Sequence, residues 1–152
     1  MTGGPVEEVG ARAAELFGSG LNCAESVLKA NMEHLGVEGA WFPRVATGFG
    51  SGIAQAGQVC GVVSGAVITG GWLLGRDEPS DSRDELYEVI ETFMLDFKRE
   101  QGSIICKELI GVDLSDRAER ERARSERLFA SRCRPLVEFG AAAIAGLLSQ
   151  RH

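Results

Sequence analysis

The chain has 152 residues, of which 44% are hydrophobic and 25% are charged, as is typical of a globular domain with a sizeable core. The net charge of −6 argues against a nucleic-acid partner or an anionic membrane surface. Residues 1–20 carry three glutamates and no compact apolar run before a cleavage site, so we expect no signal peptide. We therefore expect a cytoplasmic protein whose four cysteines are reactive thiols or metal ligands rather than structural disulfides.

The first two helices are predicted at residues 5–18 and about 22–35. Pro5 suits a first helical position, and apolar residues follow it at helical spacing. Asn22 is a good N-cap, and Glu25 three residues later completes a capping box, which places Cys23 in the first turn of the second helix. Gly36 ends that helix, and residues 37–47 are predicted to form a connector with a short helical turn.

Residues 48–75 contain no charged side chain. They begin as a glycine-rich loop, residues 48–57, and continue as an apolar helix from Cys60 to about Leu74. Because uncharged segments are usually surrounded by other elements, we predict that this is a central helix and the most buried one. It is shorter than the ~20 apolar residues that span a membrane, so we expect no membrane insertion.

The later helices are predicted at residues 81–101, around Cys106, at 116–129 and from Cys133 onward. Ser103 and Ser115 are the expected caps of the second and third of these. The helix at 81–101 carries an expected buried stripe of Leu86, Ile90, Phe93 and Phe97. No segment alternates like a strand. We therefore predict one all-α domain over residues 1–152, a bundle of about six helices around the glycine-rich helix.

All four cysteines, Cys23, Cys60, Cys106 and Cys133, fall near the amino ends of predicted helices. A helix amino end carries partial positive charge and free amide groups, and both lower the pKa of a thiol. Basic neighbours act in the same direction, since Lys107 follows Cys106 while Arg132 and Arg134 flank Cys133. The opposing interpretation is that these cysteines are small buried hydrophobic residues.

The cysteine spacing excludes several kinds of site. There is no C-x-x-C, so neither a thioredoxin-like motif nor a zinc ribbon is present. A metal site would have to gather its ligands from separate helices. His34 lies about 16 Å from Cys23 along a straight helix, too far to share one metal, and is expected to be a surface or core histidine.

The glycines from residue 48 onward are spaced as in a phosphate-binding loop. No strand precedes them, however, and no Gly-Lys-Ser/Thr follows. We expect instead that backbone amides of this region face a cysteine sulfur, and the candidate residues are Gly50, Gly52, Gly57 and Gly61.

Residues 115–134 contain seven arginines against four acids. Arg117 with Glu121, and Arg122 with Glu126, have the i,i+4 spacing that favours a solvated, salt-bridged helix face. The alternative is a surface for an anion or a partner next to Cys133.

The order and context of the cysteines resemble a known family. The hexapeptide from Cys60 to Gly65, CGVVSG, is similar to a C-G-A-x-x-G motif, and GFGSGIAQAGQ before it is similar to a glycine-rich lead-in. Cys23 lies in LNCAESVL, and Cys106 and Cys133 follow in the family's order. Over residues 10–135 the chain thus resembles the C-GCAxxG-C-C redox-active proteins, with Val62 where the family usually has alanine. The resemblance implies a small helical cytoplasmic protein with a redox role, and related domains fused to haem proteins keep an iron–sulfur site open.

Three functions remain open. In the first, a thiol–disulfide oxidoreductase or electron carrier, Cys60 is the attacking thiolate, Cys23 or Cys106 resolves it, and Cys133 serves a second pair or a relay. In the second, all four thiolates, those of Cys23, Cys60, Cys106 and Cys133, are ligands of an iron–sulfur cluster or metal ion. In the third, the protein is a non-catalytic helical interaction module. The expected partners are a redox protein or a small thiol, and the glycine-lined helix suggests a homodimer.

Overall fold

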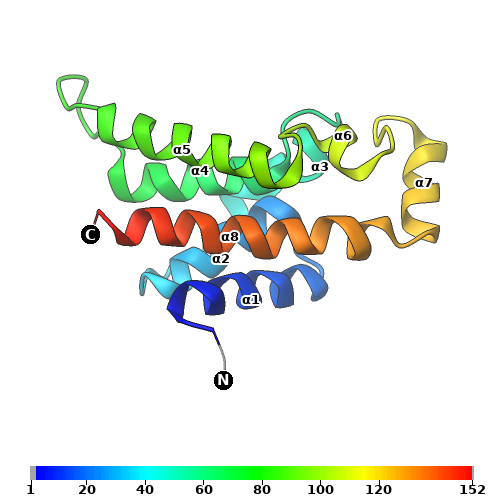
Figure 1. Ribbon diagram of the computed structural model, residues 1–152, viewed down its shortest axis with the longest axis horizontal. Coiled ribbons are helices and arrows are strands. Elements are labelled where there is room, and N and C mark those ends of the chain that lie inside the picture. Colours follow the sequence, from blue (N-terminus) through cyan, green and yellow to red (C-terminus); the bar gives the residue numbers. More distant parts are fainter. Residues whose placement is uncertain (1–2, 152) are drawn as a thin grey trace.

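The computed structural model describes residues 3–151, which form an all-α domain, as predicted (Figure 1). The helices are α1 (Pro5–Gly18), α2 (Cys23–His34), the 3₁₀ helix η1 (Arg44–Phe49), α3 (Gly50–Ile53), α4 (Gly61–Leu74), α5 (Asp84–Gln101), α6 (Cys106–Ile110), α7 (Arg117–Ser125), the π-helical turn η2 (Phe129–Cys133) and α8 (Arg134–Ser149). The six longer α-helices correspond to the predicted ones. None of the described helices has the length and apolar character that crossing a membrane requires.

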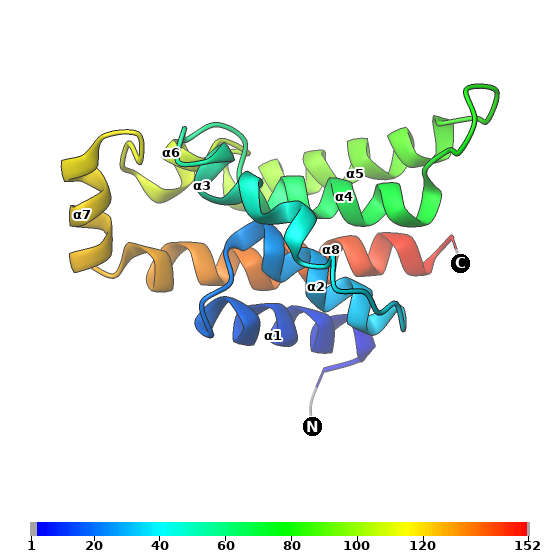
Figure 2. The ribbon, with the colours of Figure 1, turned by 180° about the vertical axis from the view of Figure 1, so that it is seen from behind.

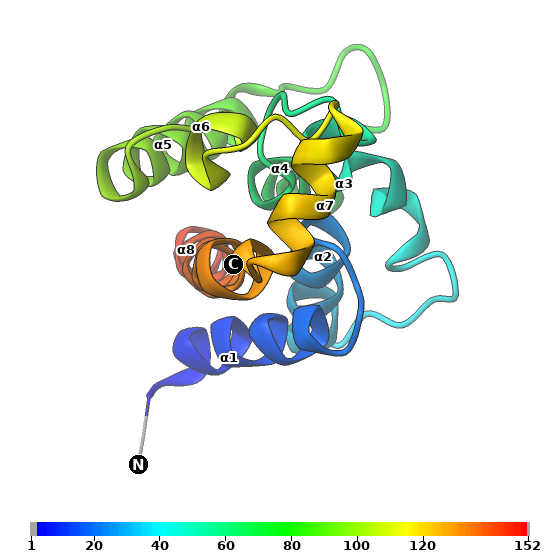
Figure 3. The ribbon, with the colours of Figure 1, turned by 90° about the vertical axis from the view of Figure 1, so that its right-hand side faces the viewer.

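Helix α8 runs through the middle of the molecule. It packs against α1 on one side, against α4 and α5 on the other, and also against α2 (Figures 1 and 2). Seen end-on, α7 crosses the molecule at the end where α8 begins (Figure 3). The main core lies between these helices, and its largest fully buried side chains include Phe93 and Phe97 of α5.

The helix starts depend on local capping. The capping box at Asn22 and Glu25 is present, with both hydrogen bonds at 2.8–2.9 Å. The expected cap Ser115 is wrong, because Asp116 occupies the N-cap position of α7 and accepts from the amides of Ala118 and Glu119. Ser103 also lies outside the cap position, which Ile105 holds, although the Ser103 hydroxyl accepts from the Ile105 amide.

Helix α4 is not surrounded on every side, contrary to our prediction. Its first half is buried, but Val67 is 40% exposed and Trp72 is 45% exposed. The buried side packs against α2, where Gly61 and Gly65 allow a close approach. A Cβ atom on Gly65 would lie only 2.8 Å from the carbonyl oxygen of Ala24. The glycines therefore serve one helix contact rather than a fully enclosed helix.

Helix α3 and the two residues after it form a left-handed turn. Five consecutive residues have positive φ angles, from Ser51 at 55° to Gln55 at 73°, and Ile53 among them is β-branched. A left-handed conformation costs about 1–2 kcal/mol for each residue that has a side chain. Backbone hydrogen bonds from Ala54 to Gly48 and from Gln58 to Gly52 hold the turn in this shape.

Replacing Gly65 by alanine should destabilise the protein by about 1–3 kcal/mol, because the added Cβ forces α2 away from α4. Gly71→Ala in the same helix is the matched control, since its Cβ would meet nothing within 4 Å. That change should stabilise the protein by about 0.5–1 kcal/mol through helix propensity. Urea unfolding measures both, and equal effects would contradict the proposed close contact.

Candidate functional site

All four cysteines line one small cavity, although they come from four separate parts of the chain. The cavity has a volume of about 20 Å³, which is room for about one water molecule. Each cysteine is free, Cys23 is half-buried and the other three are buried. The rest of the lining is mainly apolar and comprises Ser51, Gly52, Gly61, Leu109, Ile110, Leu114, Phe129 and Leu136.

The contact between α2 and α4 positions the first two cysteines. Cys23 is the first residue of α2, and Cys60 is the N-cap of α4. The helix starts meet at Gly61, where an added Cβ would lie 3.2 Å from the Cβ of Cys23. A side chain on Gly61 would therefore push the two cysteine-bearing helix starts apart.

Cys106 is held by a short antiparallel pairing of two loop segments. Val59 and Ile105 form an isolated bridge. On either side of it, the Cys60 amide donates to Ile104 at 2.8 Å and the Cys106 amide donates to Gln58 at 2.6 Å. Cys106 then begins α6, and its Cβ would lie 2.7 Å from a Cβ on Gly52. The left-handed turn at Gly52 thus fits directly against Cys106.

Cys133 ends the π-helical turn that leads into α8. The Arg134 amide donates to the carbonyl of Phe129, so the helical hydrogen bonding continues through this point. The expectation that Cys133 lies at a free helix amino end is therefore wrong. Isolated π turns occur frequently at functional sites, where the extra residue changes the direction of a side chain.

The thiols of Cys23 and Cys133 line the same cavity and shift each other's pKa. Cys23 donates to the Cys133 thiolate, and this lowers the pKa of Cys133 although burial opposes the change. The charge of Arg132 lowers the pKa of Cys133 further. The same hydrogen bond, together with burial, raises the pKa of Cys23 well above its usual value of 9.0.

Burial dominates the other two thiols. It raises the pKa of Cys60 to about 12, although the amides of Val62 and Val63 at the start of α4 act against the rise. Burial also raises the pKa of Cys106 to about 11. These values do not favour Cys60 as the most reactive thiol. Arg132, next to Cys133, was the sequence signal for the thiol whose pKa is lowered.

The glycines expected to direct amides at a sulfur have different surroundings. Gly52 and Gly61 line the cavity, while Gly50 packs against Asn22 and Gly57 against Lys107. The loop amides of Ala54, Gly57 and Gln58 are already bonded within the loop.

The arrangement of ligands does not fit the metal alternative. Among residues 3–151, no group of three or more His, Cys, Asp or Glu side chains is arranged to hold a metal ion. The cavity between the sulfurs has room for only about one water molecule, which is too little for an iron–sulfur cluster. His34, which we did not expect to be a ligand, is exposed at the end of α2.

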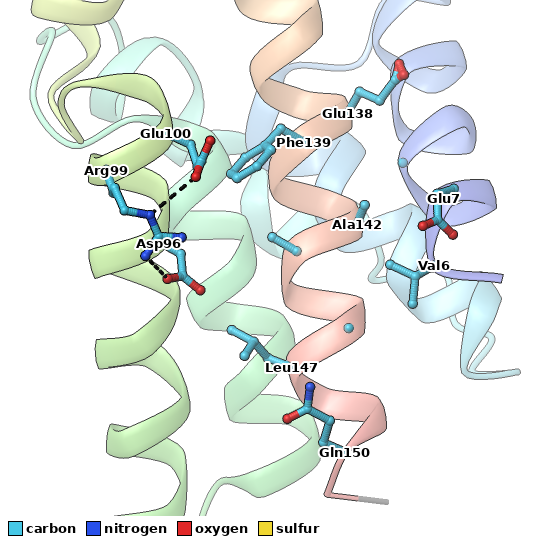
Figure 4. A pocket seen from close by; sticks show the side chains of 13 residues that line it. Val6, Glu7, Asp96, Arg99, Glu100, Glu138, Phe139, Ala142, Leu147 and Gln150 are labelled. Atoms are coloured by element: carbon cyan, nitrogen blue, oxygen red, sulfur yellow. Dashed lines mark hydrogen bonds and ion pairs between the residues drawn. The ribbon is translucent and has the colours of Figure 1, made fainter. Parts of the chain in front are cut away.

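A larger groove of about 570 Å³ lies between α1, α5 and α8 (Figure 4). No cysteine lines it. Its arginine, Arg99, forms ion pairs with Asp96 at 3.0 Å and Glu100 at 3.3 Å. The reactive side chains are therefore concentrated at the cysteine cavity, despite its small size.

Comparison with known proteins agrees with the pattern of the cysteines. The family model described as "Putative redox-active protein (C_GCAxxG_C_C)" matches residues 21–147, which include all four of them. No curated protein and no solved structure matches the chain.

The raised pKa of Cys60 predicts a loss of stability at alkaline pH in the reduced protein. Between pH 9 and about 12 this thiol ionises in the unfolded chain but not in the folded one. Its contribution to the free energy of unfolding is therefore complete below pH 9 and falls above it. From pH 8 to 10 the loss should be about 1.4 kcal/mol. Urea unfolding of wild type and Cys60→Ala should show this difference in pH dependence, and parallel pH profiles would contradict the raised pKa.

Proposed function

The chain belongs to the C_GCAxxG_C_C family of redox-active proteins, and on this premise we propose that it exchanges thiols and disulfides through Cys133 and Cys23. The observation that carries the proposal is that Cys23 and Cys133 line the same small cavity, where the neighbouring Cys23 thiol lowers the pKa of Cys133. A thiolate, and not a thiol, is the nucleophile in disulfide exchange. Four free cysteines and this chemistry suit a reducing compartment, and we propose the cytoplasm.

Cys133 takes the first step. Its thiolate attacks one sulfur of a substrate disulfide, forms a mixed disulfide with it and releases the other half as a thiolate. Cys23 then loses its proton to the solvent or the leaving thiolate and attacks the sulfur of Cys133. A Cys23–Cys133 disulfide forms and the second half of the substrate leaves. The substrate gains two electrons and two protons, which the dithiol loses, and the reverse exchange with a dithiol or a small thiol restores the protein.

The hydrogen bond also accounts for the order of the two steps. Donation to the Cys133 thiolate is the largest cause of the raised pKa of Cys23. That cause disappears once Cys133 is part of a mixed disulfide, because no thiolate is left to accept the hydrogen bond. The pKa of Cys23 then falls, although burial still raises it, so Cys23 is a better nucleophile after Cys133 has reacted than before.

Cys60 and Cys106 take no step in this exchange. Burial holds both as neutral thiols, with pKa values of about 12 and 11. Cys106 is therefore a suitable site for a control variant in the same cavity.

Cys23→Ala should trap the mixed disulfide on Cys133, because the resolving thiol is missing. Cys106→Ala should instead proceed to the Cys23–Cys133 disulfide. Mass spectrometry after a brief reaction with a small disulfide separates the two products. Cys133→Ser should lower the rate of the first step at neutral pH at least about tenfold, because serine has no thiolate to attack the disulfide. Equal rates in Cys133→Ser and wild type would refute the assignment of the nucleophile.

A further inference from the structure

The basic residues gather at the cysteine end of this acidic chain. Residues 105–134 hold eight of the 16 lysines and arginines but six of the 22 acids. This segment includes α6, α7 and the π turn at the end of the molecule that α7 crosses (Figure 3). Its side chains Cys106, Leu114 and Cys133 also belong to one core cluster, so the basic segment packs directly on the cavity.

Arg132 lies at the rim of the cavity. It precedes Cys133, and its guanidinium donates to the carbonyl oxygen of Ile110 at 2.5 Å. Ile110 lines the cavity, so the guanidinium links the Cys133 turn to the end of α6. The same group would lie 2.5 Å from a Cβ on Gly111, which places it against the end of α6.

Arg120 of α7 also binds the main chain of a residue that lines the cavity. Its guanidinium donates to the carbonyls of Leu114 at 2.9 Å and Ser115 at 3.3 Å, and Leu114 also lines the cavity. Within the described part of the chain, neither Arg120 nor Arg132 forms an ion pair with a carboxylate. Arg122 on the same helix as Arg120, by contrast, is paired with Glu119 at 3.0 Å and with Glu126 at 3.5 Å.

Two arginines without a carboxylate partner beside the cavity favour a substrate with negative charge. A guanidinium has five N–H donors, and the main-chain carbonyls occupy only one or two of them here. The remaining donors suit a carboxylate, which binds a guanidinium through two parallel hydrogen bonds. We propose that the disulfide attacked by Cys133 carries carboxylates next to its sulfurs, and that Arg120 and Arg132 bind them. This inference rests on the proposed exchange function, and the carboxylates themselves take no part in the bond exchange.

The test uses three aliphatic disulfides of similar size and different charge. They are dithiodipropionate with two carboxylates, neutral bis(hydroxyethyl) disulfide, and cystamine with two ammonium groups. For each probe, the rate at which it oxidises the protein is divided by the rate at which it oxidises mercaptoethanol. This ratio corrects for the different intrinsic reactivities of the three disulfides. On this scale the anionic probe should react fastest. Raising NaCl from about 0.01 M to 1 M shortens the screening length from about 30 Å to 3 Å and should remove its advantage.

Arg120→Gln should lower the ratio of anionic to neutral rates by about three- to tenfold, as expected for one charge at close range. Arg122→Gln is the matched control on the same helix, because its guanidinium is already paired with glutamates, and it should leave the ratio unchanged. Should Arg120→Gln not fold, the charge series and its salt dependence in wild type still decide the question.

The possible outcomes separate this inference from the proposed function. The charge preference alone would be overturned if the protein exchanged with the neutral probe but did not prefer the anionic one. It would also be overturned if Arg120→Gln and Arg122→Gln had equal ratios of anionic to neutral rates. No oxidation of Cys23 and Cys133 by any probe would overturn the exchange function and this inference with it. A further comparison identifies whether the carboxylates belong to a polypeptide or a small molecule. It uses a disulfide-linked peptide with glutamates beside its cysteines and its counterpart with lysines. A preference shared by the peptide indicates an acidic polypeptide, and one confined to dithiodipropionate indicates a small molecule.

Discussion

The close approach of α2 and α4 is the constraint on which the rest of the site depends. Two glycines one helical turn apart, Gly61 and Gly65, remove the side chains that would separate the helices. The contact occurs at the helix starts, so it brings together Cys23 and Cys60 as well as the apolar side chains that follow them along the two helices. Helix stability is given up at both positions, by roughly 1 kcal/mol each, in exchange for this packing.

The cavity makes four chemically identical thiols different from one another. Burial alone would keep all of them protonated, and it does so for Cys60 and Cys106. Cys133 differs because a neighbouring thiol donates to it and Arg132 lies close by. Cys133 is therefore the one thiol of the four whose pKa is lowered. The helix amino ends have a smaller influence, as the high pKa of Cys60 shows even though amides of α4 face its sulfur.

The sequence was a good guide where structure depends on near neighbours. The capping box at Asn22 and the spacing of Phe93 and Phe97 predict helices correctly, because capping and periodicity act within a few residues. The uncharged segment was misleading, since the absence of charge does not require burial, and Val67 lies on a side of α4 that is open to solvent.

The contact between Cys23 and Cys133 was beyond the reach of such patterns. It depends on how α2 and the π turn before α8 meet in space, and these segments lie near opposite ends of the chain. The pKa values were equally inaccessible, because burial by distant segments determines them. The order of the four cysteines and the CGVVSG hexapeptide nevertheless indicated the family correctly.

The left-handed turn at Ser51–Gln55 has a consequence for how the cavity opens. Most walls of the cavity are helical, and separating them would break packing and hydrogen bonds at the same time. Ser51 and Gly52 form a wall whose backbone is in an unfavourable conformation, and local unfolding there returns about 1–2 kcal/mol for each residue with a side chain. Displacing this segment would relieve that strain, which offsets part of the cost of breaking the hydrogen bonds of the turn and its contact with Cys106.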